Sequence, residues 1–209
     1  MIYSMAVSCL SIAVALHLSV VFGLLCVPPS EGAITQLPPN TASQVLPCKF
    51  WNSTMLDCSA RNLSSVPAEL LPIATAVDLS ANDIAQLTEH DFTNLPRLRY
   101  LNLSINVLLT IGNNTFRNLV TLQTLDLSQN NIESLNSNAF AGLLELEYLD
   151  LSKNSIISVP AEVFRDLGNL RQLSLFYNSM SVLPSDAFVP LRKVHTLDLS
   201  LNLLDLTDQ

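Results

Sequence analysis

Basic side chains are scarce in this chain, where 10 Lys and Arg residues stand against 18 Asp and Glu residues and give a net charge of −8. Binding to nucleic acid needs basic surface to neutralise phosphates, so no nucleic-acid partner is expected. Glycine is scarce too, with five residues in 209, which leaves little for the Gly-rich loops that hold nucleotide phosphates. The sequence also lacks the signatures of metalloproteases, serine hydrolases, P-loop proteins and dinucleotide-binding enzymes. We therefore expect no enzymatic activity, no cofactor and no catalytic metal.

Charged residues are missing altogether before Glu31. Residues 5–27 form an apolar run that Pro28 and Pro29 follow. This pattern predicts a secretory signal peptide in residues 1–32, cleaved between residues 23 and 32. The run is also long enough to span a bilayer, so a retained signal anchor is the alternative. Both readings place the rest of the chain in the secretory pathway and predict a secreted or extracellular location.

Cysteine is limited to four residues, and Cys9 and Cys26 lie inside the apolar run. Cleavage of the signal peptide would leave Cys48 and Cys58 as one pair. A single pair in an oxidising compartment predicts a disulfide. A zinc site would need further ligands, and only His90 and His195 lie outside the apolar run.

What the chain has in abundance is leucine, and from residue 74 onward the leucines recur with a period of 24 residues. The units follow the pattern L-x-x-L-x-L-x-x-N-x-L, and the first five have a Phe ten residues after the Asn. The first unit is a weaker copy, with Ala74 and Val77 at Leu positions, and the last opens with Val194. The units are 74–97, 98–121, 122–145, 146–169, 170–193 and the partial unit 194–209, called units one to six below. Their repeated Asn residues are Asn82, Asn106, Asn130, Asn154, Asn178 and Asn202, and their Phe residues are Phe92, Phe116, Phe140, Phe164 and Phe188.

This pattern predicts a leucine-rich-repeat solenoid, the α/β-type horseshoe. The L-x-L core of each unit alternates with period two and predicts a short strand, and the strands of successive units stack in parallel. The Asn amide can bond to loop backbone that would otherwise be unpaired, and the Phe fills the opposite wall. A bulky outer wall of loops and 3₁₀ turns against closely spaced strands predicts a curved arc with the parallel sheet on its concave side.

The two ends of the repeat array differ from its middle. Residues 48–73 predict an amino-terminal cap that the disulfide fastens, preceded by an extended lead-in over residues 33–47. Unit six has neither its Phe nor a cysteine cap after it. We expect the chain to be a fragment of a longer protein or an incomplete product, and cover of this end by a partner is the alternative.

Two polar columns follow from the repeat. Asp78, Asn102, Asp126, Asp150 and Asp198 share one strand position, which is expected to face solvent, and a Ser follows two residues after each. Stacked carboxylates can bind a cation, but the repeat itself accounts for both columns. We therefore predict no metal site and no serine nucleophile.

The segment Leu56-Asp57-Cys58-Ser59, with Cys48 before it and Leu63-Ser64-Ser65-Val66-Pro67 after it, resembles the start of Toll-like receptor ectodomains. The units with L-D-L-S-x-N-x-I and a downstream Phe resemble the repeats of that family, so the resemblance covers residues 48–209. A cap with two cysteines favours the Toll-like family over other extracellular repeat proteins, many of which have four. The resemblance implies recognition of microbial or endogenous ligands, homo- or heterodimerisation, and a membrane-spanning receptor of greater length.

Departures from the repeat pattern are the best indication of a binding surface, because the solenoid does not require them. Phe176 stands where other units have Ser, and Tyr177 follows it. We expect adjacent units to bring exposed side chains into one aromatic, apolar and basic patch that contacts a ligand. Its candidate residues are Tyr148, Lys153, Arg171, Phe176, Tyr177, His195 and Leu201, and neutral variation is the alternative explanation.

Four N-x-S/T sequons predict glycosylation at Asn52, Asn62, Asn102 and Asn113. Asn102 belongs to the strand column, so a glycan there would direct a partner towards units four to six. The function that these observations favour is an extracellular recognition module for a protein or microbial ligand. A secreted matrix or adhesion scaffold is the alternative, and membrane attachment would require a retained amino-terminal segment or a span beyond residue 209.

Overall fold

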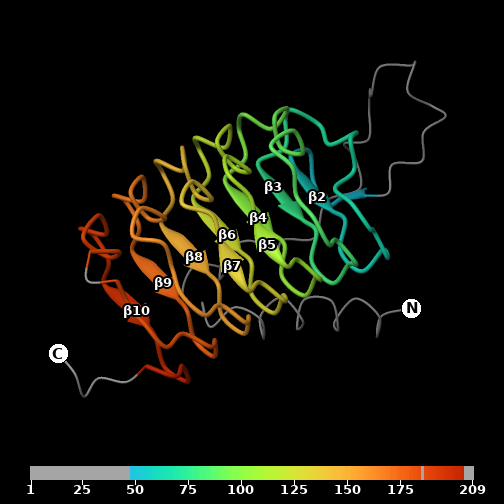
Figure 1. Cartoon of the computed structure of the whole chain (residues 1–209). Coiled ribbons are helices and arrows are strands. Elements are labelled where there is room, and N and C mark those ends of the chain that lie inside the picture. The colour runs from blue at the N-terminus through green and yellow to red at the C-terminus, as the bar shows by residue number, and fades with distance from the viewer. Residues whose placement is uncertain (1–47, 185, 205–209) are drawn as a thin grey trace, which may run out of the picture. The chain divides into compact units, whose positions relative to one another are not determined.

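The computed structural model describes residues 48–184 and 186–204 (Figure 1). The predicted signal peptide and the lead-in over residues 33–47 lie outside the described residues. Within the described part of the chain, no helix is long and apolar enough to cross a bilayer.

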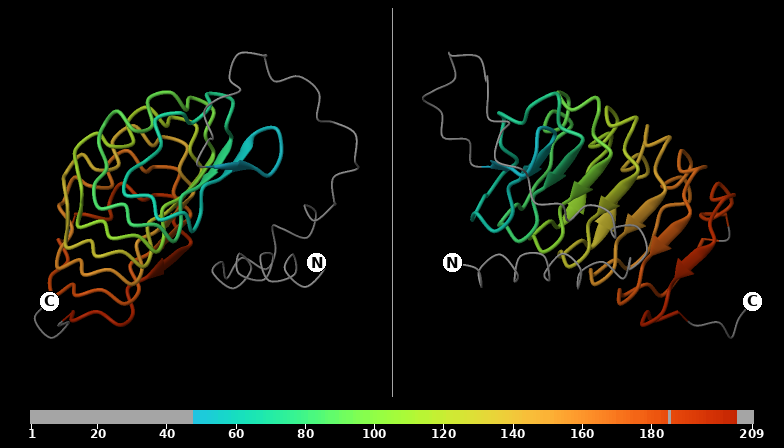
Figure 2. Two further views of the ribbon diagram at one scale, coloured as in Figure 1. Left: turned by 90° about the vertical axis from the view of Figure 1, so that its right-hand side faces the viewer. Right: turned by 180° about the vertical axis from the view of Figure 1, so that it is seen from behind.

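One sheet of eight strands runs through the repeat region in the order β1-β2-β3-β4-β6-β8-β9-β10 (Figure 1). From β2 onward every neighbouring pair is parallel. The strands are β1 (Lys49–Phe50), β2 (Met55–Asp57), β3 (Ala76–Asp78), β4 (Tyr100–Asn102), β6 (Thr124–Asp126), β8 (Tyr148–Asp150), β9 (Gln172–Ser174) and β10 (Thr196–Asp198). Each is short because the chain turns away at both ends of the L-x-L core, and Figure 2 shows the resulting coils stacked one behind another.

The register of the sheet follows the repeat period. Leu101 pairs with Leu125 and Leu125 with Leu149, so equivalent residues of successive units lie side by side. Between β2 and β3 the register is shorter, because Leu56 pairs with Val77. The amino-terminal segment therefore joins the sheet as a coil that lacks three residues of the standard unit.

The first coil also contains an antiparallel hairpin, in which β1 pairs with β2. A disulfide joins Cys48 to Cys58, and both cysteines are buried. The disulfide thus ties the start of the hairpin to the end of β2, where Leu56 enters the core.

Leucine columns and a phenylalanine column fill the interior of the coils. The strand residues Leu101, Leu125, Leu149 and Leu173 are at most 2% exposed. The Phe rings stack in an unbroken series from Phe92 to Phe188, with centroids 5.7, 6.4, 6.2 and 5.8 Å apart. Parallel strands lie about 4.8 Å apart, so the Phe side of each coil takes more room than the strand side. The repeat region therefore curves with its sheet on the concave side, and the predicted fold class is confirmed.

The convex side differs from the prediction in two details. A second sheet of two parallel strands, β5 (Thr110–Ile111) and β7 (Ser134–Leu135), forms between units two and three and was not predicted. The expected 3₁₀ structure is limited to single turns over the described residues. Such a turn follows each Phe, as where Leu119 N donates to Phe116 O and Leu167 N to Phe164 O.

Candidate ligand-binding face

Six asparagine side chains, the Asn ladder, fix the turn at the end of each strand of units one to six. Asn130 shows the arrangement. Its Nδ2 donates to Leu103 O at 3.0 Å in the preceding unit and to Leu127 O at 3.1 Å in its own, while its Oδ1 accepts from Leu108 N at 3.1 Å. One amide therefore satisfies buried backbone groups of two adjacent coils. Equivalent contacts form at Asn82, Asn106, Asn154, Asn178 and Asn202.

The acidic column was expected to face solvent, and the structure corrects this. Asp126 is 5% exposed, and Asp78, Asn102, Asp150 and Asp198 are half-buried. Each side chain folds back so that its Oδ1 accepts a hydrogen bond from the backbone N–H two residues later, as from Ser128 N to Asp126 at 2.8 Å. The carboxylate satisfies a donor at the end of the strand, which explains why Asp and Ser occur together.

Burial changes the acidity of this column. Burial is the main cause that raises the pKa of Asp126 from 3.8 to about 6, and the nearby Asp150 and Asp78 carboxylates raise it further against the hydrogen bonds from Ser128. Burial, with a smaller effect of Asp57, also raises the pKa of Asp78. Burial beside Asp78 and Asp126 raises the pKa of the Tyr100 hydroxyl as well. Within the described residues no group of three or more His, Cys, Asp or Glu side chains is placed to hold a metal ion.

Unit five departs from this arrangement at both positions at once. Ser174 replaces the Asp, and Phe176 replaces the Ser two residues later. The Phe176 ring is half-buried and its centroid lies 6.1 Å from that of Tyr177, which is 59% exposed. Tyr177 also has a positive φ of 54°, shared by the equivalent residue of every unit, which turns its side chain outward from the end of the strand.

The predicted patch is divided by the structure into two parts. Lys153, Phe176, Tyr177 and Leu201 follow their strands on three adjacent coils; Lys153 N donates to Phe176 O at 2.8 Å and Tyr177 N to Ser200 O at 3.0 Å. We call these four residues the unit-five rim. Leu201 is 61% exposed, and Lys153 is exposed as well.

Arg171 and His195 lie at the opposite end of the strands. Both are exposed, and His195 N donates to Arg171 O at 2.8 Å. Arg171 precedes β9 whereas Tyr177 follows it, a separation of roughly 20 Å for an extended segment of this length. The Arg171 guanidinium also pairs with Glu147 at 3.2 Å. The expectation of one continuous patch is therefore wrong, and the half-buried Tyr148 lies on the sheet between the two parts.

A second exposed apolar group was not predicted from the sequence. Ile105, Val107 and Leu109 of unit two are 48%, 38% and 54% exposed. The signal was present, since these residues occupy positions between the repeat's core residues where unit three has Gln129, Asn131 and Glu133.

The four sequon asparagines differ in accessibility. Asn52, Asn62 and Asn113 are exposed. Asn102 is half-buried in the acidic column, and its Oδ1 accepts from Ser104 N at 2.9 Å. Glycosylation at these four positions remains a prediction.

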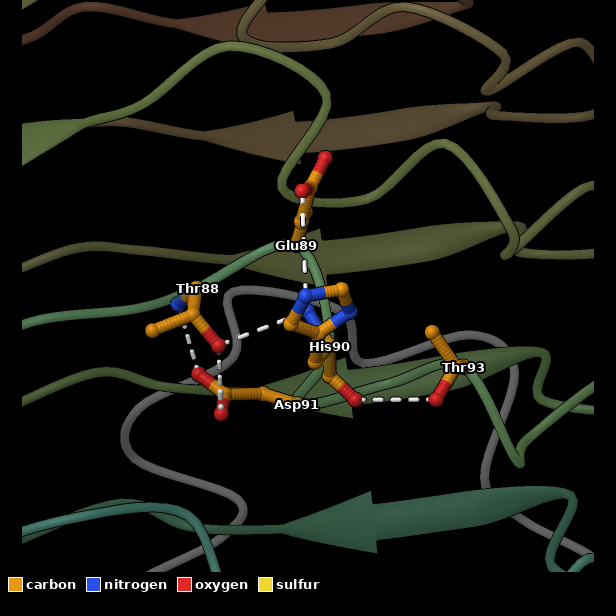
Figure 3. Close-up of polar contacts among 5 residues, drawn as sticks. All are labelled: Thr88, Glu89, His90, Asp91 and Thr93. Atoms are coloured by element: carbon orange, nitrogen blue, oxygen red, sulfur yellow. Dashed lines mark hydrogen bonds and ion pairs between the residues drawn. The ribbon is translucent and has the colours of Figure 1, made fainter.

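His90 and His195, the two histidines outside the apolar run, lie in unit one and unit six. His90 is in a convex loop where Thr88 donates twice to Asp91, from N to Oδ2 at 2.7 Å and from Oγ1 to Oδ1 at 2.9 Å (Figure 3). His90 N donates to Thr88 Oγ1 at 3.3 Å. Glu89 lies 3.7 Å from His90 Nε2, and the loop is closed by Thr93 Oγ1, which donates to His90 O. This is the bonding of a capped turn, and it accounts for the polar cluster without catalysis.

Residues 96–156 and 145–204 match the family described as "Leucine rich repeat". This region holds five of the six ladder asparagines and four of the five stacked Phe residues. The chain belongs to the leucine-rich-repeat family. Leucine-rich repeat-containing G-protein coupled receptor 4 of Mus musculus and of Homo sapiens are each 38% identical to this leucine-rich-repeat protein over 72 residues. That segment is 34% of the chain and 7% of the receptor.

Among solved structures, this leucine-rich-repeat protein is similar to a chain of the Toll–Spatzle complex from Drosophila. The TM-score is 0.67 with 27% identity, and the match covers 71% of this chain and 20% of that chain. The predicted resemblance to a Toll-like receptor ectodomain is thus confirmed. The chain spans less than a tenth of the curated receptors and one fifth of the solved chain.

Proposed function

We propose that this leucine-rich-repeat protein is an extracellular recognition module that binds a protein ligand at the unit-five rim. The observation that carries the proposal is that Ser174 and Phe176 both depart from the repeat. Unit five thereby lacks the hydrogen-bonded Asp–Ser turn and has two adjacent aromatic rings, Phe176 and Tyr177. Exposed aromatic side chains beside a basic residue are the groups that anchor protein interfaces.

The similar proteins support a receptor role. The structural neighbour is described as a complex of Toll with Spatzle, and the curated relatives are named as receptors. Within the repeat array, the aromatic rings of the rim lie in unit five, away from the sequon residue Asn102 in unit two. A glycan at Asn102 would therefore leave the rim accessible.

The test compares the double variant Phe176→Ser/Tyr177→Ala with the wild-type chain. Both replacements restore residues found at the same positions in other units, Ser152 and Ala81, so the coil should still fold. The wild-type chain is first screened against a library of secreted proteins, and a protein that binds is carried forward. Each aromatic anchor contributes about 2 kcal/mol or more to binding. Loss of even one anchor in the double variant should therefore raise Kd at least roughly 30-fold.

The matched control is Ile105→Ala, which removes an exposed apolar side chain at the position equivalent to Tyr177 in unit two. It should leave Kd unchanged. Equal affinity for the double variant and the wild type, or equal weakening in variant and control, would reject the unit-five rim. Failure of every secreted protein to bind the wild-type chain would count against the recognition function itself.

A further inference from the structure

A hollow lies on the loop side of the repeat region, between the segments that follow Phe164 and Phe188. Its volume is about 590 Å³, within the range of small-ligand sites. It is lined by Arg165, Gly168, Asn169, Val189, Pro190 and Arg192. None of these residues belongs to the unit-five rim.

At Gly168, which lines the hollow, unit four has no side chain where units two and three have an apolar one. Val120 and Leu144 occupy the equivalent position of units two and three, and they are 47% and 54% exposed. A Cβ at Gly168 would meet nothing within 4 Å. Gly142 differs, because its φ is +85° and a Cβ there would lie 2.7 Å from Arg117 O. Gly142 is thus required by the backbone, whereas Gly168 only leaves space open.

Positive charge surrounds this space in a chain of net charge −8. Arg165 and Arg192 line it from two successive units, and both are exposed. Lys193 Nζ donates to Asn169 Oδ1 at 2.7 Å, which places a third cation beside the lining. Asp166 lies 3.8 Å from Arg165 Nε, but its Oδ2 already accepts from Gly142 N at 2.8 Å. Arg192 forms no ion pair with any carboxylate of residues 48–184 or 186–204.

The remaining wall is apolar. Val189 is 68% exposed, and Val189 and Pro190 line the hollow together with the two arginines. Guanidinium groups bind tetrahedral oxyanions through paired N–H donors. The C–H face of a sugar ring can lie against Val189 and Pro190 while its sulfate groups meet Arg165 and Arg192. We infer that this hollow is a binding site for a sulfated saccharide.

The experiment measures binding of a sulfated tetrasaccharide to the chain produced by a secretory host, using isothermal titration calorimetry. The expected result is saturable binding of the sulfated form, with at least tenfold weaker binding of the desulfated form and of inorganic sulfate or phosphate. Arg165→Gln/Arg192→Gln should weaken binding at least tenfold. Gly168→Leu should do the same without changing charge, since it fills the hollow with the side chain that unit three has at Leu144.

The matched control is Arg97→Gln/Arg99→Gln, which removes two exposed arginines where unit one meets unit two and should leave the affinity unchanged. Thermal unfolding of each variant verifies that it is folded. The inference is overturned by absence of binding at millimolar saccharide, by equal binding of the desulfated form or of the free anions, or by equal weakening in the control. It is also overturned if Gly168→Leu binds like the wild type.

Discussion

Units three and five hold their strands in the same sheet and the same register, yet they end those strands differently. In unit three, Asp126 accepts from Ser128 N, whereas unit five has Ser174 and Phe176 at these positions. The ladder residue is unaffected: Asn178 Nδ2 donates to Leu151 O at 3.0 Å and to Leu175 O at 3.1 Å, as Asn130 does in unit three. Every coil of units one to six therefore uses the ladder asparagine to end its strand, whereas the Asp–Ser pair is a local feature that unit five lacks.

The largest loss of stability is expected from removal of a ladder asparagine, the feature that units three and five share. Asn130→Ala leaves Leu108 N without its acceptor. It also removes one of two asparagine donors from each of the carbonyls of Leu103 and Leu127, which still accept from Asn106 and Asn154. An unsatisfied buried N–H costs about 1–3 kcal/mol and each of the two lost hydrogen bonds about 1 kcal/mol, so the free energy of unfolding should fall by about 3–5 kcal/mol. Urea unfolding followed by circular dichroism measures this change.

Asn131→Ala is the control, because Asn131 is exposed and adjacent in sequence. Asn178→Ala should destabilise unit five as strongly as Asn130→Ala destabilises unit three. A loss below about 1 kcal/mol in either ladder variant would contradict the role assigned to the amide.

Removal of the buried Asp126 carboxylate should change the free energy of unfolding less than removal of a ladder asparagine. Of the two units compared, only unit three has this charge. Because the folded pKa of Asp126 is about 6 and the ordinary value is 3.8, the folded state binds more protons than the unfolded state between these pH values. Its contribution to stability is therefore present at low pH and declines as pH rises through about 6. The difference corresponds to at most about 3 kcal/mol at pH 7.

Asp126→Asn should raise the free energy of unfolding at pH 7 by about 1–3 kcal/mol, because the amide keeps an acceptor for Ser128 N and carries no charge. Asn102 shows that this exchange fits, since its Oδ1 accepts from Ser104 N at 2.9 Å. Urea unfolding at pH 4.5 and 7 should show a flatter pH dependence than in the wild type. Stability of the variant that still falls steeply over this range would refute the assignment to Asp126.

Two substitutions in unit five would remove its difference from unit three at the end of the strand. Ser174→Asp/Phe176→Ser gives unit five the residues of unit three, so one backbone hydrogen bond is gained while a carboxylate becomes partly buried and ring contacts are lost. These effects oppose one another, and the free energy of unfolding should change by no more than about 1 kcal/mol. A larger loss would show that Phe176 is a structural residue of the coil.

The smallest effect concerns the position after the Asp–Ser pair, which has the same conformation in both units. Gln129 and Tyr177 both have φ of 54°, and so does the β-branched Ile105 of unit two. Asn adopts this conformation more readily than a β-branched residue. Ile105→Asn should therefore stabilise the chain by about 0.5–1 kcal/mol, measured by urea unfolding, whereas Gln129→Asn should change it less.

The repeat made the sheet, its register and the two interior columns predictable. A period of 24 residues with fixed Leu, Asn and Phe positions leaves one way to stack the coils, so Leu125 had to face Leu101 and Phe140 had to face Phe116. The second sheet at Thr110 and Ser134 was not predictable in the same way. It depends on where two loops come close, and those loops are the part of the unit that the pattern leaves free.

The candidate site was predicted in composition but not in arrangement. Phe176 and Tyr177 were identified because they break the pattern. The prediction of one patch overlooked that Arg171 precedes the strand and Tyr177 follows it, which the sequence positions already imply. The burial of Asp126 was missed because an alternating pattern assigns alternate residues to solvent. Its side chain instead folds back on the backbone of Ser128.

The constant register from β3 to β10 makes each complete coil an interchangeable module. Asn154 reaches back to Leu127 O, and Asn130 reaches back to Leu103 O in the same way. Excision of residues 122–145 would therefore bring Asn154 against Leu103 with the ladder bonds preserved, and only the β5–β7 side of the coil would lose its pairing. An array of this kind can lengthen or shorten by whole units through unequal recombination, whereas the first coil, with its shorter offset at Leu56 and Val77, cannot be duplicated into the middle.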